Sequence, residues 1–269
     1  MFVIQKAFFV TMITIDFPLK FEIFGRTILA HPVFETVGIF LAMRFYYYLK
    51  RKSPEKMPLS HSLIILIGAT AGALIGSKLI GNLEKPAVLF GQEFSFIRFW
   101  TSNTITGGLA FGLIGVELAK KIINHKESTG DLIVFPLLLA MIIGRIGCFF
   151  TGVYEETYGL PTDSFFGIYL GDQYLRHPVA LYEIIFLLLL GFVIFRLKRT
   201  KKFVSGFLFQ FLMLNYFLFR FFLDFIKPHE NIFLNLGTIQ ILSLLMIFYY
   251  IYTIKKSFKL MKKISVSDG

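Results

Sequence analysis

The sequence predicts an all-α, polytopic membrane protein with seven transmembrane helices, its N-terminus outside and its C-terminus in the cytoplasm. Of the 269 residues, 55% are hydrophobic and only 17% are charged, and the mean hydropathy is +0.68. In a soluble domain of this size, roughly a quarter of the residues are charged. The apolar runs are continuous rather than alternating, which argues against a transmembrane β-barrel.

Seven apolar segments each approach the ~20 residues that an α-helix needs to cross a bilayer. They cover residues 31–49, 59–80, 105–123, 132–150, 178–195, 203–226 and 232–254. We expect them to form one integral membrane domain over residues 1–269, with a polar outer loop at 151–177. The apolar run at residues 1–17 lacks a small-residue cleavage site, so we interpret it as mature protein lying at the interface.

Lys and Arg are distributed unevenly between the loops. Seventeen of them follow the first, third, fifth and seventh segments, and seven lie in the opposite set of loops. The positive-inside rule therefore places the C-terminus in the cytoplasm and the 151–177 loop outside. This pattern explains the net charge of +11 without a nucleic-acid partner. Arg44, at the cytoplasmic end of the first segment, is interpreted as an interfacial, snorkelling side chain.

Several common site types have no support in the sequence. The single cysteine, Cys148, excludes a disulfide framework within the chain and a thiolate metal cluster. Metalloprotease, P-loop and nucleophile-elbow motifs are absent from the sequence. We therefore expect no metal and no cofactor. A small buried core thiol and a nucleophile are both open interpretations of Cys148.

Ionisable side chains inside the apolar segments are the strongest functional signal. Arg145 lies in the fourth segment, Glu183 in the fifth, Arg220 and Asp224 in the sixth, and Glu35 in the first. With a rise of about 1.5 Å per residue, all five are expected at one level of the outer leaflet. Charged groups at bilayer depth are costly and are usually functional. Purely structural ion pairs between helices remain the alternative.

Two arginines at one depth suit an anionic headgroup, because the guanidinium fork matches phosphate oxygens. Arg220 and Asp224 share a helix face at i,i+4. His177 could be a general base near neutral pH, or it could orient the start of the fifth segment together with Pro178.

Glycines recur in the second and third segments. Gly68, Gly72 and Gly76 mark the second, and small residues at this spacing predict close helix packing. In the third, Thr106, Gly107 and Gly108 could alternatively form a thin-walled approach to a ligand.

The stretches GRIGCFFTG, LRHPVALYE and FRFFLDFIKP resemble signature motifs of the bacterial prolipoprotein diacylglyceryl transferases. GRIGCFFTG, at residues 144–152, is similar to the family signature GRIGNFxNGE. LRHPVALYE, at 175–183, is similar to RHPSQLYE, and FRFFLDFIKP, at 219–228, is similar to RFxxEFxRxP. TGGLAFGLIG, at 106–115, resembles HGGLIG, and LNLGTIQILSL resembles the start of the last helix. The matches occur in the family's order over about residues 107–244.

The resemblance implies seven spans with an outward N-terminus, in a bacterial inner membrane, and an active site facing the outer leaflet. It implies transfer of a diacylglyceryl group from phosphatidylglycerol to the lipobox cysteine thiol of a prolipoprotein, with release of glycerol phosphate. Arg145 and Arg220 take the places of the family's two essential arginines, and Asp224 that of a neighbouring glutamate. Arg176, His177, Tyr182 and Glu183 match directly.

The chain departs from the family where the thiol is activated. Thr106 replaces the family's histidine before GGLIG, and Cys148 replaces the first asparagine of the signature. The base could instead be His177, Glu183 or an acid of the 155–156 pair. Alternative functions are a related transferase with a different acceptor, such as a carbohydrate or another lipid, and a non-catalytic lipid-binding protein.

The candidate catalytic residues are therefore Arg145, Arg220, His177 and Glu183. The candidate residues that bind or support the phospholipid headgroup are Arg145, Arg220, Asp224, Glu35, His31, Arg176, Tyr182, Thr106, Gly107, Gly108, Glu155 and Glu156.

Overall fold

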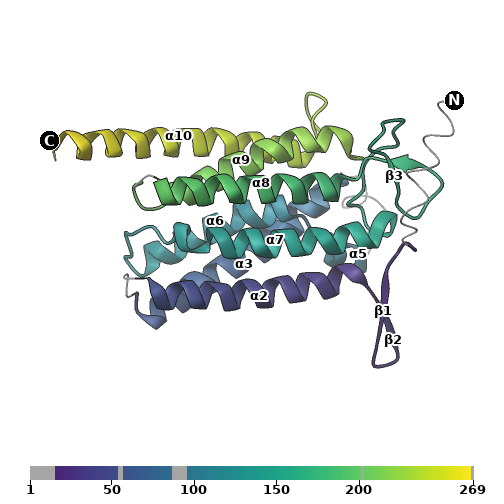
Figure 1. The fold of residues 1–269 in the computed structure, drawn as a ribbon, viewed down its shortest axis with the longest axis horizontal. Coiled ribbons are helices and arrows are strands. Elements are labelled where there is room, and N and C mark those ends of the chain that lie inside the picture. The colour runs from purple at the N-terminus through teal and green to yellow at the C-terminus, as the bar shows by residue number, and fades with distance from the viewer. Residues whose placement is uncertain (1–15, 54–56, 87–95, 201–202, 268–269) are drawn as a thin grey trace. The chain divides into compact units, whose positions relative to one another are not determined.

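The structure is a computed structural model that describes residues 16–53, 57–86, 96–200 and 203–267. The predicted interfacial segment at residues 1–17 lies almost wholly outside the described residues. Each of the seven predicted segments coincides with one long helix (Figure 1). These helices are α2 (Ala30–Lys52), α3 (Leu59–Leu83), α6 (Ile105–Ile122), α7 (Gly130–Thr151), α8 (Val179–Thr200), α9 (Phe207–Leu223) and α10 (Thr238–Ser267).

Several helix boundaries differ from the predicted ones by up to 13 residues, and the structure explains two of these differences. α9 begins at Phe207 rather than at residue 203, because Gly206 at φ 88° precedes it. The Asp131 carboxylate accepts hydrogen bonds from the backbone N–H groups of Gly206 and Phe209 at 2.7 and 3.0 Å, and so caps this helix start. α10 continues beyond the predicted end at residue 254, since hydropathy detects only the apolar part of a helix and lysine is a good helix former.

Short elements were not predicted, and the description as all-α is therefore incomplete. β1 (Lys20–Ile23) and β2 (Arg26–Leu29) form an antiparallel hairpin directly before α2. β3 (Ile168–Tyr169) pairs with β4 (Leu175–Arg176) inside the predicted outer loop. The short helices are α5 (Phe96–Thr101), η1 (Gly152–Tyr154) and η2 (Asp224–Ile226).

Five of the helices in the described residues are long and apolar enough to cross a membrane, namely α3, α7, α8, α9 and α10. α6 has the length but carries Glu117, Lys120 and Lys121 in its last turns. The structure thus supports a polytopic membrane protein. Seven spans and the orientation of the termini stay predictions.

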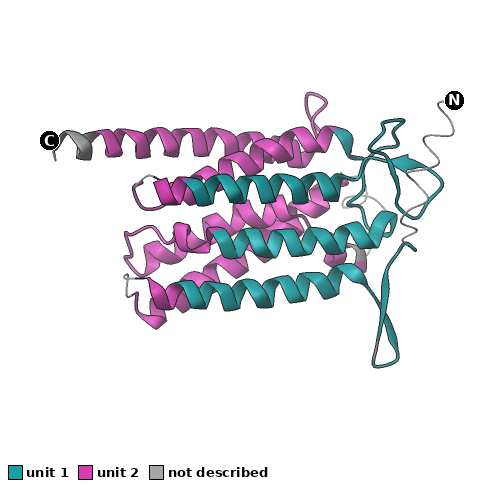
Figure 2. Cartoon of the chain, viewed as in Figure 1, with its two compact units in different colours: residues 1–49, 135–196, 226–228 teal, residues 50–134, 197–225, 229–269 magenta. Residues whose placement is uncertain are grey.

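The chain divides into two compact units (Figure 2). Unit 1 comprises residues 1–49, 135–196 and 226–228, and unit 2 comprises residues 50–134, 197–225 and 229–269. The boundaries at 134/135 and 196/197 fall inside α7 and α8, so the units alternate along the chain rather than following one another. The single membrane domain expected over the whole chain stays a prediction.

In unit 1, α2 packs against α7 through small residues. A Cβ placed on Gly38 would lie 3.2 Å from the Ala140 carbonyl oxygen and 3.2 Å from the Ile143 Cβ. Further along α7, a Cβ on Gly147 would meet the Phe34 Cβ at 2.8 Å and the His31 Cα at 3.0 Å. The two glycines therefore let α2 and α7 approach closely at both ends of the contact.

In unit 2, α3 and α6 are in backbone contact along their glycines. A Cβ on Gly115 would lie 2.0 Å from the Gly68 carbonyl oxygen, and one on Gly72 would lie 2.3 Å from the Phe111 carbonyl oxygen. Small residues allow such contact where lipid supplies no hydrophobic drive between helices. The predicted glycine packing is confirmed.

We expect Gly115→Ala to destabilise the protein by about 1–3 kcal/mol, because the added methyl overlaps the backbone of α3. Gly112→Ala is the matched control one turn earlier, since its Cβ would meet atoms only at 3.5 Å or beyond. Thermal unfolding of the two variants in detergent measures the difference. Equal midpoints for the two would contradict the packing role given to Gly115.

Candidate functional site

An ion pair between Arg145 on α7 and Glu183 on α8 joins these two helices in unit 1. The Arg145 Nε and the Glu183 Oε1 are 2.9 Å apart. The side chains are 12% and 1% exposed. A charge with so little access to water must be paired, and removing one partner would leave the other uncompensated. Glu183 thus occupies the position expected of an acid that holds the arginine in place.

A second polar group lies beside this pair, and His31 in the first turn of α2 is at its centre. The His31 Nδ1 contacts the Glu155 carboxylate. The His31 Nε2 lies 3.7 Å from the Cys148 Sγ. An Arg145 Nη1 lies 3.6 Å from the same sulfur. Cys148 is buried at 5% exposure. The sulfur therefore connects the arginine with the histidine.

The end of α7 positions this group. The Thr151 hydroxyl donates a hydrogen bond to the Gly147 carbonyl at 3.0 Å and accepts one from the His31 backbone N–H at 3.2 Å. Thr151 thereby ties the start of α2 to the end of α7. Gly152 follows at φ 63°, where a side chain would be strained and its Cβ would lie 2.2 Å from the Leu170 carbonyl oxygen. This turn brings Glu155 back towards His31.

Arg176 is held inside the outer loop. Its Nη2 and Nε lie 2.7 and 2.8 Å from the Asp172 carboxylate. Its guanidinium carbon lies 4.8 and 5.6 Å from the ring centroids of Tyr158 and Tyr174. A fork already bound to a carboxylate and covered by two aromatic rings indicates a loop-stabilising role. Arg176 was expected to support the headgroup, and its contacts are those of a residue that stabilises the loop.

His177 and Tyr182 contact each other. The His177 Nδ1 lies 3.3 Å from the Tyr182 hydroxyl. The His177 backbone N–H donates to the Leu160 carbonyl at 3.1 Å, and the Leu160 N–H donates to Ile226 at 2.8 Å. These bonds fit the interpretation that His177 orients the start of α8. Its role as a base stays a hypothesis.

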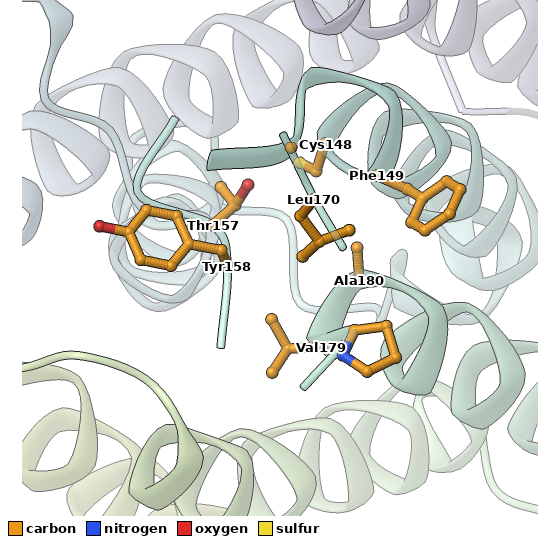
Figure 3. A pocket seen from close by; sticks show the side chains of 9 residues that line it. Cys148, Phe149, Thr157, Tyr158, Leu170, Val179 and Ala180 are labelled. Atoms are coloured by element: carbon orange, nitrogen blue, oxygen red, sulfur yellow. The ribbon is translucent and has the colours of Figure 1, made fainter. Parts of the chain in front are cut away.

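A small cavity of about 10 Å³ lies next to the sulfur of Cys148 (Figure 3). This volume has room for about one water-sized group. Its lining is mostly apolar and comes from the end of α7, the outer loop and the start of α8. The lining residues are Cys148, Phe149, Gly152, Thr157, Tyr158, Leu170, Pro178, Val179 and Ala180.

Unit 2 holds the other candidate site residues. Arg220 and Asp224 are both buried, and the Arg220 Nη2 lies 4.0 Å from the Asp224 Oδ1, as the i,i+4 spacing predicted. Thr106 is fully buried. Gly107 is used for packing, because its Cβ would lie 2.3 Å from the Gly76 carbonyl oxygen. Gly108 has only ordinary contacts, at 3.5 Å or beyond. Proximity of these residues to Arg145 stays a prediction.

The acids predicted around the site divide into two groups. Glu155 and Glu183 contact His31 and Arg145, respectively. Glu35 lies on an exposed face of α2, and within the described residues no ion pair joins it to Arg145. Glu156 is also exposed. The supporting role expected of Glu35 stays a prediction, and in unit 1 α2 presents His31 rather than Glu35 to α7.

Sequence reasoning did not detect that His31, Cys148 and Glu155 meet. His31 and Glu155 are 124 residues apart in the chain. The one available signal was that His31 begins the first apolar segment while Glu155 follows the fourth, so both were expected at the outer surface.

The chain is similar to known proteins of one family. The family model described as prolipoprotein diacylglyceryl transferase matches residues 18–255. A Helicobacter pylori protein is 30% identical over 264 residues, covering 86% of this chain and 88% of the relative. A Chlorobaculum tepidum protein is 35% identical over 220 residues, covering 73% and 75%. An Ehrlichia ruminantium protein is 30% identical over 210 residues, covering 72% and 76%. All three are named phosphatidylglycerol–prolipoprotein diacylglyceryl transferase.

We expect Gly147→Ala to lower stability by about 1–3 kcal/mol, because the methyl would push α7 away from His31 and Phe34. Gly144→Ala, one turn earlier in α7, is the control, since among the described residues its Cβ would meet nothing within 4 Å. Thermal unfolding in detergent compares the two. A Gly147 variant as stable as the Gly144 variant would show that α2 and α7 do not need this close approach.

Proposed function

This chain belongs to the prolipoprotein diacylglyceryl transferase family, and we propose that it transfers a diacylglyceryl group from phosphatidylglycerol to the lipobox cysteine thiol of a prolipoprotein. Glycerol phosphate is the leaving group. The observation that carries the proposal is Arg145, fixed by the buried Glu183 in the segment that matches the family signature. The family matches cover most of the chain, so the proposal concerns the whole protein.

In the proposed reaction, the acceptor sulfur attacks the terminal carbon of the diacylglyceryl group, and the carbon–oxygen bond to phosphate breaks. Negative charge develops on the departing glycerol phosphate. A guanidinium that is already oriented stabilises this charge without reorganising during the reaction. The ion pair with Glu183 supplies that orientation for Arg145. Glu183 is a poor candidate for the base, because its carboxylate is already paired and is 1% exposed.

We assign Arg220 a second contact to the phosphate, with Asp224 as its supporting acid. Their burial and the i,i+4 geometry in unit 2 support this assignment. The motif at 219–228, which is similar to the family's RFxxEFxRxP, supports it independently.

The proposed location is the inner membrane of a bacterium, with the site facing the outer leaflet. The five apolar helices and the Lys/Arg bias of the loops support this location. The acceptor is then the signal peptide of a prolipoprotein that has reached the outer face.

We predict that Arg145→Lys lowers transfer by about 100-fold or more, because a lysine supplies one point charge instead of a planar fork. The assay uses purified protein in detergent, labelled phosphatidylglycerol and a lipobox peptide. Arg44→Lys is the matched control, since Arg44 lies exposed on α2. We expect it to keep normal transfer.

Each other outcome of this assay contradicts part of the proposal. Near-normal transfer by Arg145→Lys would remove the phosphate role of Arg145. Release of glycerol phosphate without a lipidated peptide would favour the transferase with a different acceptor. Folded wild-type protein that binds the lipid without turnover would favour the non-catalytic lipid-binding alternative.

The proposed topology predicts opposite labelling of two loop positions. Residue 163 is exposed. In the Asp163→Cys variant, the introduced cysteine should react with a membrane-impermeant maleimide in intact spheroplasts, because the 151–177 loop lies outside. A cysteine at Lys126→Cys should react only after the membrane is permeabilised. The reverse pattern would invert the orientation, and the native Cys148 background is measured with the unsubstituted protein.

A further inference from the structure

The imidazole of His31 lies between a carboxylate and a thiol. Its Nδ1 contacts the Glu155 carboxylate, and its Nε2 lies 3.7 Å from the Cys148 Sγ. A carboxylate at one ring nitrogen fixes the orientation of the ring and stabilises the imidazolium that forms when the other nitrogen takes a proton. The His31 and Glu155 side chains are 27% and 25% exposed. The contacts from Glu155 to His31 to Cys148 are those of an acid–base relay that ends at a sulfur.

The same three residue types can ligate a metal ion, and their ligand atoms lie within 4.8 Å of one another. A single ion, however, is bound through one nitrogen of an imidazole. Here the two ring nitrogens have two different partners, Glu155 and Cys148. The geometry therefore favours a relay over a site that binds one ion.

Cys148 is the member of the relay that reaches the rest of the site. The Arg145 Nη1 lies 3.6 Å from its sulfur, and the Nε of the same guanidinium is paired with Glu183. Cys148 also lines the small cavity, whereas His31 and Glu155 do not (Figure 3). A group at this cavity therefore adjoins Cys148, whose sulfur lies next to the arginine assigned to the phosphate.

The cavity is suited to a thiol. Its lining includes Phe149, Leu170, Val179 and Ala180. A cysteine side chain behaves as a small hydrophobe with a weak S–H donor, so its thiol can lie against such a lining at little cost. A carbohydrate hydroxyl would lose stronger hydrogen bonds to water in the same place.

We propose that the acceptor thiol is presented to Cys148 at this cavity, and that Cys148, His31 and Glu155 take up its proton. The inference rests on the proposed transferase function. In this scheme, His31 takes the role of the family's histidine, whose position is occupied by Thr106 in this chain. The acceptor S–H proton passes to the Cys148 sulfur, and the proton shared by Cys148 and His31 moves onto Nε2. The acceptor sulfur bonds to the terminal glyceryl carbon. The electron pair of the broken carbon–oxygen bond leaves with glycerol phosphate, and the proton returns to solvent as the products depart.

Cys148 is not a covalent carrier in this scheme. Attack by its own sulfur on the lipid would give a thioether, whose sulfur is a poor leaving group. The diacylglyceryl group would then stay on the enzyme after one turnover. A relay passes only the proton and leaves Cys148 unchanged.

The pH profile of His31→Gln tests the relay in the phosphatidylglycerol and lipobox-peptide assay. Without the relay, only acceptor molecules that are already thiolate can react. The rate should then be about 100-fold below wild type at pH 6.5 and should rise about tenfold per pH unit. The rise should end near pH 8.5, the ordinary pKa of a cysteine thiol, where the variant approaches wild type. Glu155→Gln should lose less of the transfer rate than His31→Gln, and its rate should rise more steeply with pH than that of wild type.

Two variants serve as comparators. Arg145→Lys should stay impaired at every pH, because a thiolate acceptor does not replace a phosphate contact. His177→Gln removes the other candidate histidine and should keep the shallow wild-type profile, whatever its rate. A steep profile in His177→Gln would transfer the base role to His177.

Three further results would overturn the relay. These are a His31→Gln profile parallel to wild type, loss of wild-type activity on treatment with EDTA that Zn²⁺ restores, and a diacylglyceryl mass increase on the purified protein that Cys148→Ser abolishes. If the wild type lipidates no peptide at any pH, the proposed function itself fails. That outcome differs from failure of the relay, in which the wild type is active and His31→Gln shares its profile.

Discussion

The need to pair a buried arginine is the constraint on which unit 1 depends. Arg145 and Glu183 lie on two apolar helices, and a lone charge at either place would be strongly destabilising. Their contact fixes α7 and α8 relative to each other. Cys148 follows Arg145 by three residues and therefore lies on the same side of α7. One ion pair thus orients both the guanidinium and the thiol.

The polar residues at and after the end of α7 provide hydrogen bonds that the apolar parts of the helices cannot make. Thr151 ties the start of α2 to α7, and the turn at Gly152 returns the chain so that Glu155 reaches His31. Nearby, Asp172 and two tyrosines hold Arg176 inside the loop. In the proposed relay, these contacts matter because a base must be positioned within hydrogen-bond reach of the group it deprotonates.

The replacement of the family histidine by Thr106 illustrates how chemistry depends on a site rather than on one sequence position. Thr106 is fully buried on α6 and cannot act as a base near neutral pH. His31 on α2 is backed by a carboxylate and adjoins the thiol next to Arg145. In the proposed reaction, the proton-accepting role lies on α2 in this chain, while the arginines assigned to the phosphate keep their places in the motifs.

Local properties of the sequence determined the long helices, the glycine contact of α3 with α6, and the pairing of Arg220 with Asp224. A helix that faces lipid needs a continuous apolar run, and residues four apart share a face, so both can be counted along the chain. The hairpins escaped prediction because strands of two to four residues show no usable period. Only the tertiary structure decided that α2 presents His31, rather than Glu35, to α7 and that Glu155 meets it from the loop. The physical reason is that apolar periodicity does not specify the rotation of a helix in lipid, which close packing at Gly147 and the pairing of distant polar groups set instead.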